Sequence, residues 1–435
     1  MRIVLFNLPL FLGLASCEVT DSSQKQQNPQ AKVLQQTQQV QGPSPAAVTA
    51  DSLAAHDPHV GEAFAAAPGD IADPEMRPIM QAQVVLDRLG FTPGVVDGKE
   101  GLSTRNAVSG FQEANSLTVT GKVDDATIKA LAQWNNIPAT RVVTIPTEIA
   151  AGPFYKIPKD PAEQAKMPTL GYQSLDEKLA ERFHTTIDTL KQLNPGGVPA
   201  GAKPSAGVPS LSTSTVPTSG ASASAPSSID PSSKGDTAPA LQPGPPSFFH
   251  AGQQIRVPNV GADAVDPSAV ADPAWSQTLA MLGVGSQQPK AAKVVVSKSK
   301  GTLKAYDETG KLAAVYTATM GSQHDPLPLG NWKILGIDKN PKFHYNPALF
   351  WDAKPGAEKA MLPAGPKGPV GVVWIALSKP HYGIHGTPHP ETIGRAESHG
   401  CVRPKRRPPR GIARESTPGS AATPSRLLKK EAAGW

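Results

Sequence analysis

Long hydrophobic runs, aromatic residues and cysteines are all scarce in this chain of 435 residues. No apolar run reaches the roughly 20 residues that a membrane-spanning helix needs, which excludes a polytopic membrane protein. Aromatic residues make up only 5% of the chain, whereas proline (46) and glycine (39) together make up about a fifth of it. This composition excludes one compact globule and predicts a few small domains joined by disordered connectors.

The two cysteines, Cys17 and Cys401, are too few for a disulfide framework. Cys17 follows Arg2 and an apolar stretch that has the length of a signal peptide. The sequence Leu-Ala-Ser-Cys at 14–17 resembles a bacterial lipobox, which implies a lipid on Cys17. An ordinary signal peptide with a chance cysteine is the alternative, and both predict export. We expect a periplasmic protein, lipid-anchored to a bacterial membrane, with the outer membrane favoured, and a disordered tether over 18–75.

The positive charge of the chain lies at one end. The formal net charge is +6, and residues 404–435 hold eight basic and two acidic residues, an excess of six. Residues 1–403 therefore sum to zero. Because the predicted domains are neutral, the charge does not indicate a nucleic-acid partner.

Residues 76–134 show the periodicity of three short helices, for example at Ala107, Val108 and Phe111. Thr104 and Asp124 are candidate N-caps for two of them. The text LGFTPGVVDGKEGLSTRNAVSGFQEANSLTVTGKVDDATIKAL resembles the peptidoglycan-binding domain of type 1. The resemblance implies a small helical domain that binds the bacterial wall.

Residues 170–260 contain two further helix patterns and a late strand. Leu175, Leu179 and Phe183 share one helical face, and the strand pattern falls at 251–259. Together these pieces resemble a LysM glycan-binding module with a βααβ order. Residues 196–247 interrupt it with a stretch rich in proline, serine, alanine and glycine, which predicts a disordered excursion. A linker is expected over 261–291.

From 292 to 403 the pattern changes to short β-prone runs bounded by turn residues. This region predicts a β-rich domain, so the fold class expected for the whole chain is multidomain α+β with long disordered linkers.

The chemistry-bearing stretch runs from Tyr382 to Arg403 and contains Cys401, His399 and, sixteen residues before the cysteine, His385. A thiol nucleophile needs a base near neutral pKa, and glycines beside it suit an oxyanion hole. A zinc site at His381, His385 and His389 is one alternative, but the prolines and glycines between them disfavour the helix that it needs. A buried cysteine with structural histidines is the other.

The order His-Gly-Thr, Ile-Gly and Ser-His-Gly-Cys-Val-Arg resembles the L,D-transpeptidase catalytic domain of the YkuD type. The resemblance implies that Cys401 is the nucleophile and His385 its base, with His399 and Gly400 shaping the oxyanion pocket. It further implies that Ser398 supports the loop and that Arg403 meets a substrate carboxylate. The remaining substrate-binding candidates come from the same motif: Tyr382, Gly386 and Thr387.

The implied reaction joins peptidoglycan stem peptides. Cys401 attacks the third residue of a tetrapeptide stem, releases D-alanine and forms a thioester, which an amine of a second stem resolves into a 3→3 crosslink. Water as acceptor would make the protein a carboxypeptidase. A catalytically impaired, membrane-tethered wall-binding protein is a further alternative, and an unrelated cysteine peptidase is another. No cofactor is implied; the expected partners are peptidoglycan stem peptides, glycan and the membrane.

The resemblance breaks after Arg403, where prolines and arginines replace an expected helix and closing strand. We interpret the basic stretch 404–435 as a possible frameshift near codon 403. A genuine basic tail that is attracted to an anionic surface is the alternative.

Overall fold

The computed structural model describes residues 64, 71–203, 241–260, 270–284, 290–321, 326–351, 353–393 and 402–404, the last two by their backbone alone. The predicted signal peptide, most of the tether, the centre of the excursion at 204–240 and the basic stretch after 404 lie outside these residues. Within the described part, none of the helices has the length and hydrophobicity to cross a membrane.

The N-terminal helical unit consists of α2 (Pro78–Arg88), α3 (Leu102–Ala114) and α4 (Asp125–Leu131), with a two-residue strand β1 (Phe91–Thr92). Asp124 caps α4 as predicted, because its side chain accepts a hydrogen bond from the Thr127 amide. Thr104 does not cap α3: the N-cap is Gly101, and Thr104 is buried inside the helix. There it accepts a hydrogen bond from the buried Gln83 amide group, which holds the loop between α2 and α3.

The middle unit has a βααβ core, formed by β2 (Thr140–Thr144), α7 (Leu175–Arg182), α8 (Ile187–Leu193) and β3 (Gln254–Pro258). The short helices α5 (Thr147–Ala150) and α6 (Pro161–Gln164) lie between β2 and α7. β2 and β3 pair in antiparallel register from Thr140 opposite Pro258. The first strand therefore lies outside the predicted range 170–260, since a loop of thirty residues separates it from α7.

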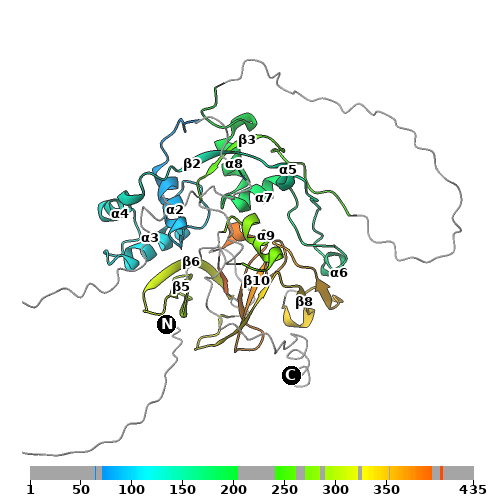
Figure 1. Ribbon diagram of the computed structural model, residues 1–435. Coiled ribbons are helices and arrows are strands. Elements are labelled where there is room, and N and C mark those ends of the chain that lie inside the picture. Colours follow the sequence, from blue (N-terminus) through cyan, green and yellow to red (C-terminus); the bar gives the residue numbers. More distant parts are fainter. Residues whose placement is uncertain are drawn as a thin grey trace, which may run out of the picture.

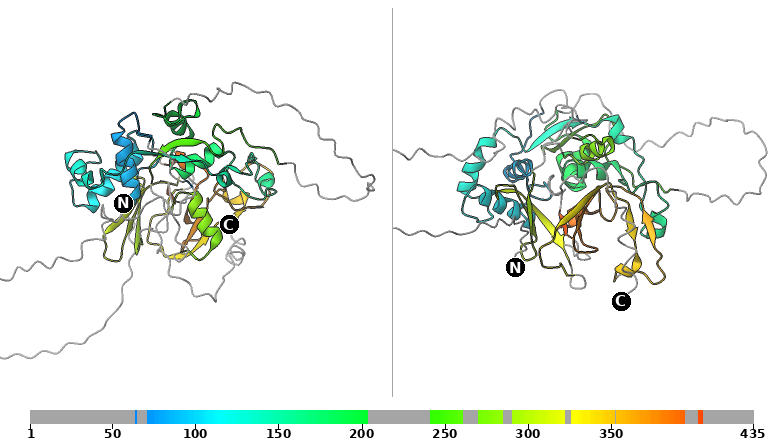
Figure 2. Two further views of the ribbon diagram at one scale, coloured as in Figure 1. Left: turned by 45° about the horizontal axis from the view of Figure 1, so that its top comes forward. Right: turned by 60° about the horizontal axis from the view of Figure 1, so that its bottom comes forward.

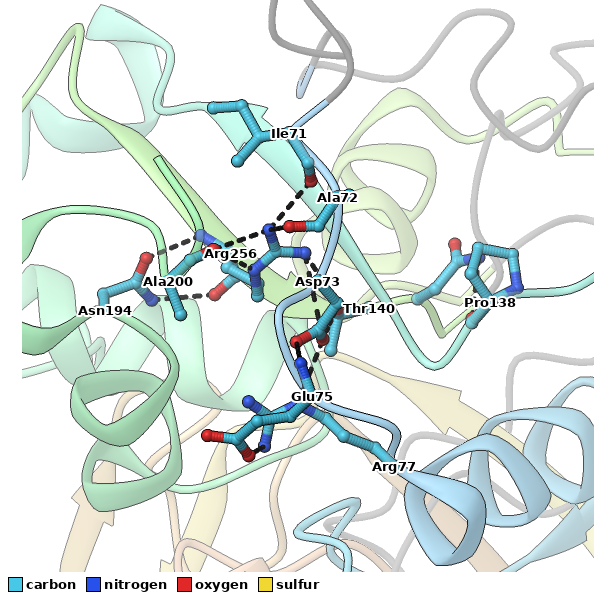
Figure 3. Close-up of polar contacts among 11 residues, drawn as sticks. Ile71, Ala72, Asp73, Glu75, Arg77, Pro138, Thr140, Asn194, Ala200 and Arg256 are labelled. Atoms are coloured by element: carbon cyan, nitrogen blue, oxygen red, sulfur yellow. Dashed lines mark hydrogen bonds and ion pairs between the residues drawn. The ribbon is translucent and has the colours of Figure 1, made fainter. Parts of the chain in front are cut away.

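Arg256 on β3 joins three segments that are distant in sequence (Figure 3). It is 1% exposed and donates hydrogen bonds to the carbonyls of Ile71, Ala72 and Ala200 and to the Thr140 hydroxyl. These bonds fix the end of the predicted tether and the start of the excursion on the βααβ core. The long excursion therefore does not open the core.

The β-rich region is a curved sheet in the order β4-β5-β6-β12-β11-β10-β7. Its strands are β4 (Lys293–Ser297), β5 (Thr302–Tyr306), β6 (Leu312–Met320), β7 (Ile334–Lys339), β10 (Val373–Leu377), β11 (Gly383–His385) and β12 (Val402–Pro404). A separate hairpin of β8 (Phe343–Tyr345) and β9 (Ala360–Leu362) projects beside α6, as Figure 2 shows. Apolar side chains such as Leu303, Ile375 and Ile384 form one core on this sheet.

A helix lies inside the segment predicted as a linker. α9 (Pro273–Met281) begins at Asp272, whose side chain caps it, and buries Trp275 and Leu279 against Val373. The Asp-Pro start and these two apolar residues account for the difference, because they supply a cap and a face to bury.

The helical unit is docked directly on the sheet, and Figure 1 shows α2 and α3 beside β5 and β6. β1 pairs in parallel with β6, with Phe91 opposite Val315. On α3, Gly110 faces the Val315 side chain so closely that a Cβ atom would lie 2.5 Å from Val315 Cγ2. Glycine at this position thus permits close helix–sheet packing.

Candidate active site

His385 occupies the end of β11, between β10 and β12 in the centre of the sheet. Its side chain is 3% exposed and stacks on the Trp374 ring, with centroids 5.2 Å apart and an interplanar angle of 22°. The two residues lie opposite each other in the antiparallel pairing of β10 and β11. Gly383 is needed nearby, since a Cβ atom there would lie within 2.6 Å of the same indole. The imidazole is therefore fixed by packing before any substrate binds.

A hydrogen bond sets the tautomer of His385. Its Nδ1 lies 2.7 Å from the carbonyl oxygen of Gly386. Because a carbonyl only accepts, Nδ1 must carry the proton, and in the neutral ring the lone pair then lies on Nε2. This is the arrangement that a histidine base requires.

Two glycines let the loop at 363–371 approach the turn after His385. Gly371 adopts a φ of +61°, and a Cβ atom there would lie 3.0 Å from Gly386 Cα. The amide of Gly386 donates to the carbonyl of Val373. The glycines of both sequence motifs therefore serve close backbone packing around the histidine.

The other predicted site residues are distributed as follows. Ser398, His399, Gly400 and Cys401 lie outside the described residues. Arg403 lies in β12 opposite Thr319, and its neighbour Val402 lies opposite Ile384 of β11. The strand that begins immediately after Cys401 in the sequence thus pairs with the strand that carries His385.

Two motif residues have local partners. The Thr387 hydroxyl accepts a hydrogen bond from the His389 amide and so stabilises the turn after His385. Tyr382 is half-buried and lines an apolar pocket on the core side of the sheet, to which His385 does not contribute. The pocket is lined by Val294, Val296, Leu327, Pro328, Trp332, Ile334, Leu377, Tyr382, Gly383, Ile384 and Val402.

Among the residues that the structure describes, no three His, Cys, Asp or Glu side chains are grouped so that they could hold a metal ion. The zinc alternative therefore has no candidate ligand set within these residues. His389 is exposed and lies 3.4 Å from a Glu391 carboxylate oxygen.

Sequence reasoning missed two features near this site. Trp374 sits in an ordinary β-prone run, and only the cross-strand register reveals its contact with His385. Glu177 and Glu181 on α7 resemble a solvated helix face, yet Glu177 pairs with Lys367 of the loop at 363–371 at 2.9 Å. Burial raises the pKa of Glu181 to about 7, and the nearby Lys367 opposes this rise. The i, i+4 spacing of the two glutamates was the available signal.

Comparison with known families identifies two regions of the chain. A family model described as "L,D-transpeptidase catalytic domain" matches residues 291–420. The chain contains an L,D-transpeptidase catalytic domain. A second family model, described as "Putative peptidoglycan binding domain", matches residues 76–131. Both family resemblances are confirmed, whereas the LysM-like identity of the middle unit stays a prediction. The catalytic-domain match continues to residue 420 and therefore extends past Arg403. The departure from the family after Arg403 is not shown by this match and stays a prediction.

Curated relatives include "Putative L,D-transpeptidase YkuD" of Bacillus licheniformis, which is 30% identical over 127 residues. That alignment covers 29% of this chain and 61% of the relative. The protein of the same name from Bacillus subtilis is 60% identical over 38 residues, which are 9% of this chain and 23% of the relative. The chain thus spans less than two thirds of the length of these relatives.

Solved structures with some likeness include an L,D-transpeptidase from Mycobacterium smegmatis, with a TM-score of 0.20 and 13% identity. It covers 36% of this chain and 65% of the other. L,D-transpeptidase 3 from Mycobacterium tuberculosis has a TM-score of 0.21 and 12% identity, and covers 36% and 68% of the two chains. Likeness at this level carries no weight beside the family match.

Proposed function

We propose that this protein is an exported L,D-transpeptidase that forms 3→3 crosslinks between peptidoglycan stem peptides. The observation that carries the proposal is the catalytic-domain match over 291–420, which includes His385 in a buried, tautomer-fixed position. Peptidoglycan is the partner that both domains indicate.

In the proposed mechanism, Nε2 of His385 takes the thiol proton of Cys401. The thiolate attacks the carbonyl carbon of the third stem residue, and the bond to the terminal D-alanine breaks as the imidazolium returns its proton to the leaving amine. A thioester remains. The amine of a second stem then attacks it, a new amide forms, and the thiol is regenerated.

The remaining predicted residues complete this proposal. His399 and Gly400 stabilise the developing oxyanion, Ser398 supports the loop, and Arg403 meets a substrate carboxylate. Tyr382 and Thr387 are the further substrate-binding candidates, and Tyr382 also lines the apolar pocket on the core side. Gly386 contributes as the acceptor that orients His385.

The test incubates the purified full chain with tetrapeptide stems and measures released D-alanine and crosslinked product. We expect release that is lost in Cys401→Ala and His385→Ala and kept in His250→Ala, a control at an exposed histidine of the middle unit. Release without crosslinks would identify a carboxypeptidase. Binding to sedimented wall material with no release would identify the second candidate, a tethered wall-binding protein, which the match at 76–131 favours.

We further propose that lipid on Cys17 anchors the protein to a membrane facing the periplasm, and that the middle unit binds glycan as a LysM-like module. Labelling cells with a fatty-acid analogue tests the anchor, because Cys17→Ala should abolish the label. Pelleting residues 71–435 with stem-free glycan strands tests the module.

A further inference from the structure

His184, in the turn between α7 and α8, lies where three parts of the chain meet. Its side chain is 5% exposed, and Nδ1 lies 3.0 Å from a carboxylate oxygen of Asp87, near the end of α2. Nε2 lies 3.0 Å from the carbonyl oxygen of Leu282, the C-cap of α9. The His184 carbonyl also accepts a hydrogen bond from the Val96 amide, in the loop between α2 and α3. One residue therefore connects the helical unit, the middle unit and α9.

The turn that carries His184 holds its backbone in an uncommon conformation. Its φ of +57° lies in the left-handed region, which a residue other than glycine adopts where the surrounding contacts hold it there. Two such contacts come from the next residue: the Thr185 amide donates to the Ala180 carbonyl, and the Thr185 hydroxyl donates to the Val96 carbonyl. The position of the imidazole between its two oxygen partners is therefore set by the turn.

The two contacts of the ring require two protons. A carbonyl oxygen only accepts hydrogen bonds, and so does an ionised carboxylate. A neutral imidazole carries one N–H and can satisfy only one of the two oxygens. The pair of His184 and Asp87 must therefore hold one proton more than a neutral ring beside a carboxylate does. This count is the same whether the proton lies on the ring or on the carboxyl group, because the two groups titrate together.

The charged groups that face the ring act in opposite directions. The Asp87 side chain is 4% exposed and, from α2, favours the imidazolium. Arg182 of α7 is also buried and opposes it from the side of Gly283, where a Cβ atom would lie 2.5 Å from Arg182 Nη1 and 3.2 Å from His184 Nε2. α9 presents the Leu282 carbonyl, and its last turn contains no charged residue.

Other charged residues of these elements have partners elsewhere. Arg88 of α2 donates to the Asn259 carbonyl. Asp97, next to Val96, accepts hydrogen bonds from the Gln83 side chain and the Lys99 amide. Glu181 of α7 has a pKa raised by burial to about 7, and the charges that act on it come from Lys367, Glu177 and Glu391. Glu181 thus titrates near neutral pH and has to be separated from His184 by experiment.

We propose that His184 is a proton-dependent switch that connects the end of α9 to α2 while its pair with Asp87 holds the extra proton. As pH rises, this proton is released to solvent. The ring then keeps the N–H that points to the carboxylate, because a hydrogen bond to a charged acceptor is the stronger of the two. The contact with the Leu282 carbonyl is lost.

The switch acts on a helix that covers the catalytic sheet. Trp275 and Leu279 of α9 pack against Val373 of β10, and Figure 1 shows α9 between α7 and β10. Val373 precedes Trp374, which stacks on His385. Release of Leu282 would therefore weaken the packing of α9 on the strand that supports His385.

Hydrogen exchange of the full chain tests the switch, measured by mass spectrometry from pH 5 to pH 8 and corrected for the intrinsic effect of pH on exchange. The amides of Leu282, Gly283 and Val284 report on it, because they donate to carbonyls of the last turns of α9. We expect their protection to fall about tenfold or more in one step as pH rises, the effect of losing a hydrogen bond to a charged group.

Two variants test the two partners separately. His184→Asn removes the titrating ring and keeps a residue type that tolerates positive φ, so the step should disappear. Asp87→Asn keeps the shape of the side chain and removes its charge, so the step should move to lower pH by about one unit or more. A merely structural role of Asp87 would lower protection at every pH without moving the step.

Two controls exclude other titrating groups. His250→Asn changes an exposed histidine of the same unit and should leave the step in place. Glu181→Gln removes the other group that titrates near neutral pH and should also leave it in place. Equal protection of the unmodified protein at pH 5 and pH 8 would overturn the inference. So would a step that persists in His184→Asn, stays at the same pH in Asp87→Asn, or disappears in Glu181→Gln.

Discussion

The packing of α3 on β6 can be tested by adding one carbon atom at Gly110. In Gly110→Ala the new Cβ would lie 2.5 Å from Val315 Cγ2, 2.9 Å from Val315 Cβ and 3.1 Å from the Phe91 ring. Ordinary carbon contacts begin near 3.4 Å. The helix must therefore move away from the sheet by most of an ångström, or Val315 must move within a core where it is 1% exposed.

Two opposing terms set the expected size. Alanine in a helix interior is favoured over glycine by about 0.8–1 kcal/mol. Overpacking a well-filled contact costs about 1–3 kcal/mol. The clash should win, since the nearest atoms belong to a branched side chain on a paired strand, and we expect a net loss of about 1–2 kcal/mol.

Thermal unfolding followed by calorimetry measures this change, with a fall in Tm of about 2–6 °C expected for a region of this size. Gly101→Ala, at the N-cap of the same helix, is the steric control, because no atom lies within 4 Å of its Cβ position and it should lose only the N-cap preference for glycine over alanine. In a Val315→Ala background, Gly110→Ala should become neutral or stabilising. A rise in Tm for the single variant, by the amount that helix propensity alone supplies, would refute the close packing of α3 on β6.

Three further predictions concern buried polar groups and the site. Burial raises the pKa of Glu181 to about 7 in the folded protein, against 4.5 for the free group, so the free energy of unfolding should fall as pH rises between these values. In urea unfolding at pH 5 and pH 8, Glu181→Gln should abolish this fall and should be more stable than the unmodified protein by about 2 kcal/mol at pH 8. An unchanged pH slope would contradict it. Trp374→Leu should lower D-alanine release about tenfold by loosening His385, whereas Trp374→Phe should retain it; equal rates in both would show that the stacking is irrelevant. Asn194→Ala should cost about 2–4 kcal/mol in chemical denaturation, since it leaves the buried amide and carbonyl of Arg256 without partners; a loss under 1 kcal/mol would mean that water replaces it.

Local patterns predicted the parts of the molecule that local chemistry controls. The helix faces of residues 76–134 are set by i, i+3 and i+4 spacing, and that unit was predicted with nearly the bounds of the family match. His385 was singled out because His-Gly-Thr is a contiguous motif whose glycine has a local use. The cap at Asp124 follows the same rule, because the residues involved are three apart.

The pairing of segments that are distant in the chain could not be predicted from the sequence. β2 pairs with β3 across more than a hundred residues, and nothing in Thr140–Thr144 alone indicates its partner. The pair of Glu177 and Lys367 joins two units that are separate in the sequence. α9 was missed for another reason: it is a helix of only nine residues, and it lies between segments of linker-like composition.

The shared hydrogen bonding of β1 and β6 has a mechanical consequence. Phe91 and Thr92 belong to the unit that matches the peptidoglycan-binding family, yet they extend the sheet that also holds β11 and His385. The two parts cannot swing independently without breaking this ladder and the α3 contact. A polymer bound by the helical unit would therefore be held at a fixed distance from the imidazole of His385, and this distance would select which part of the polymer can reach His385.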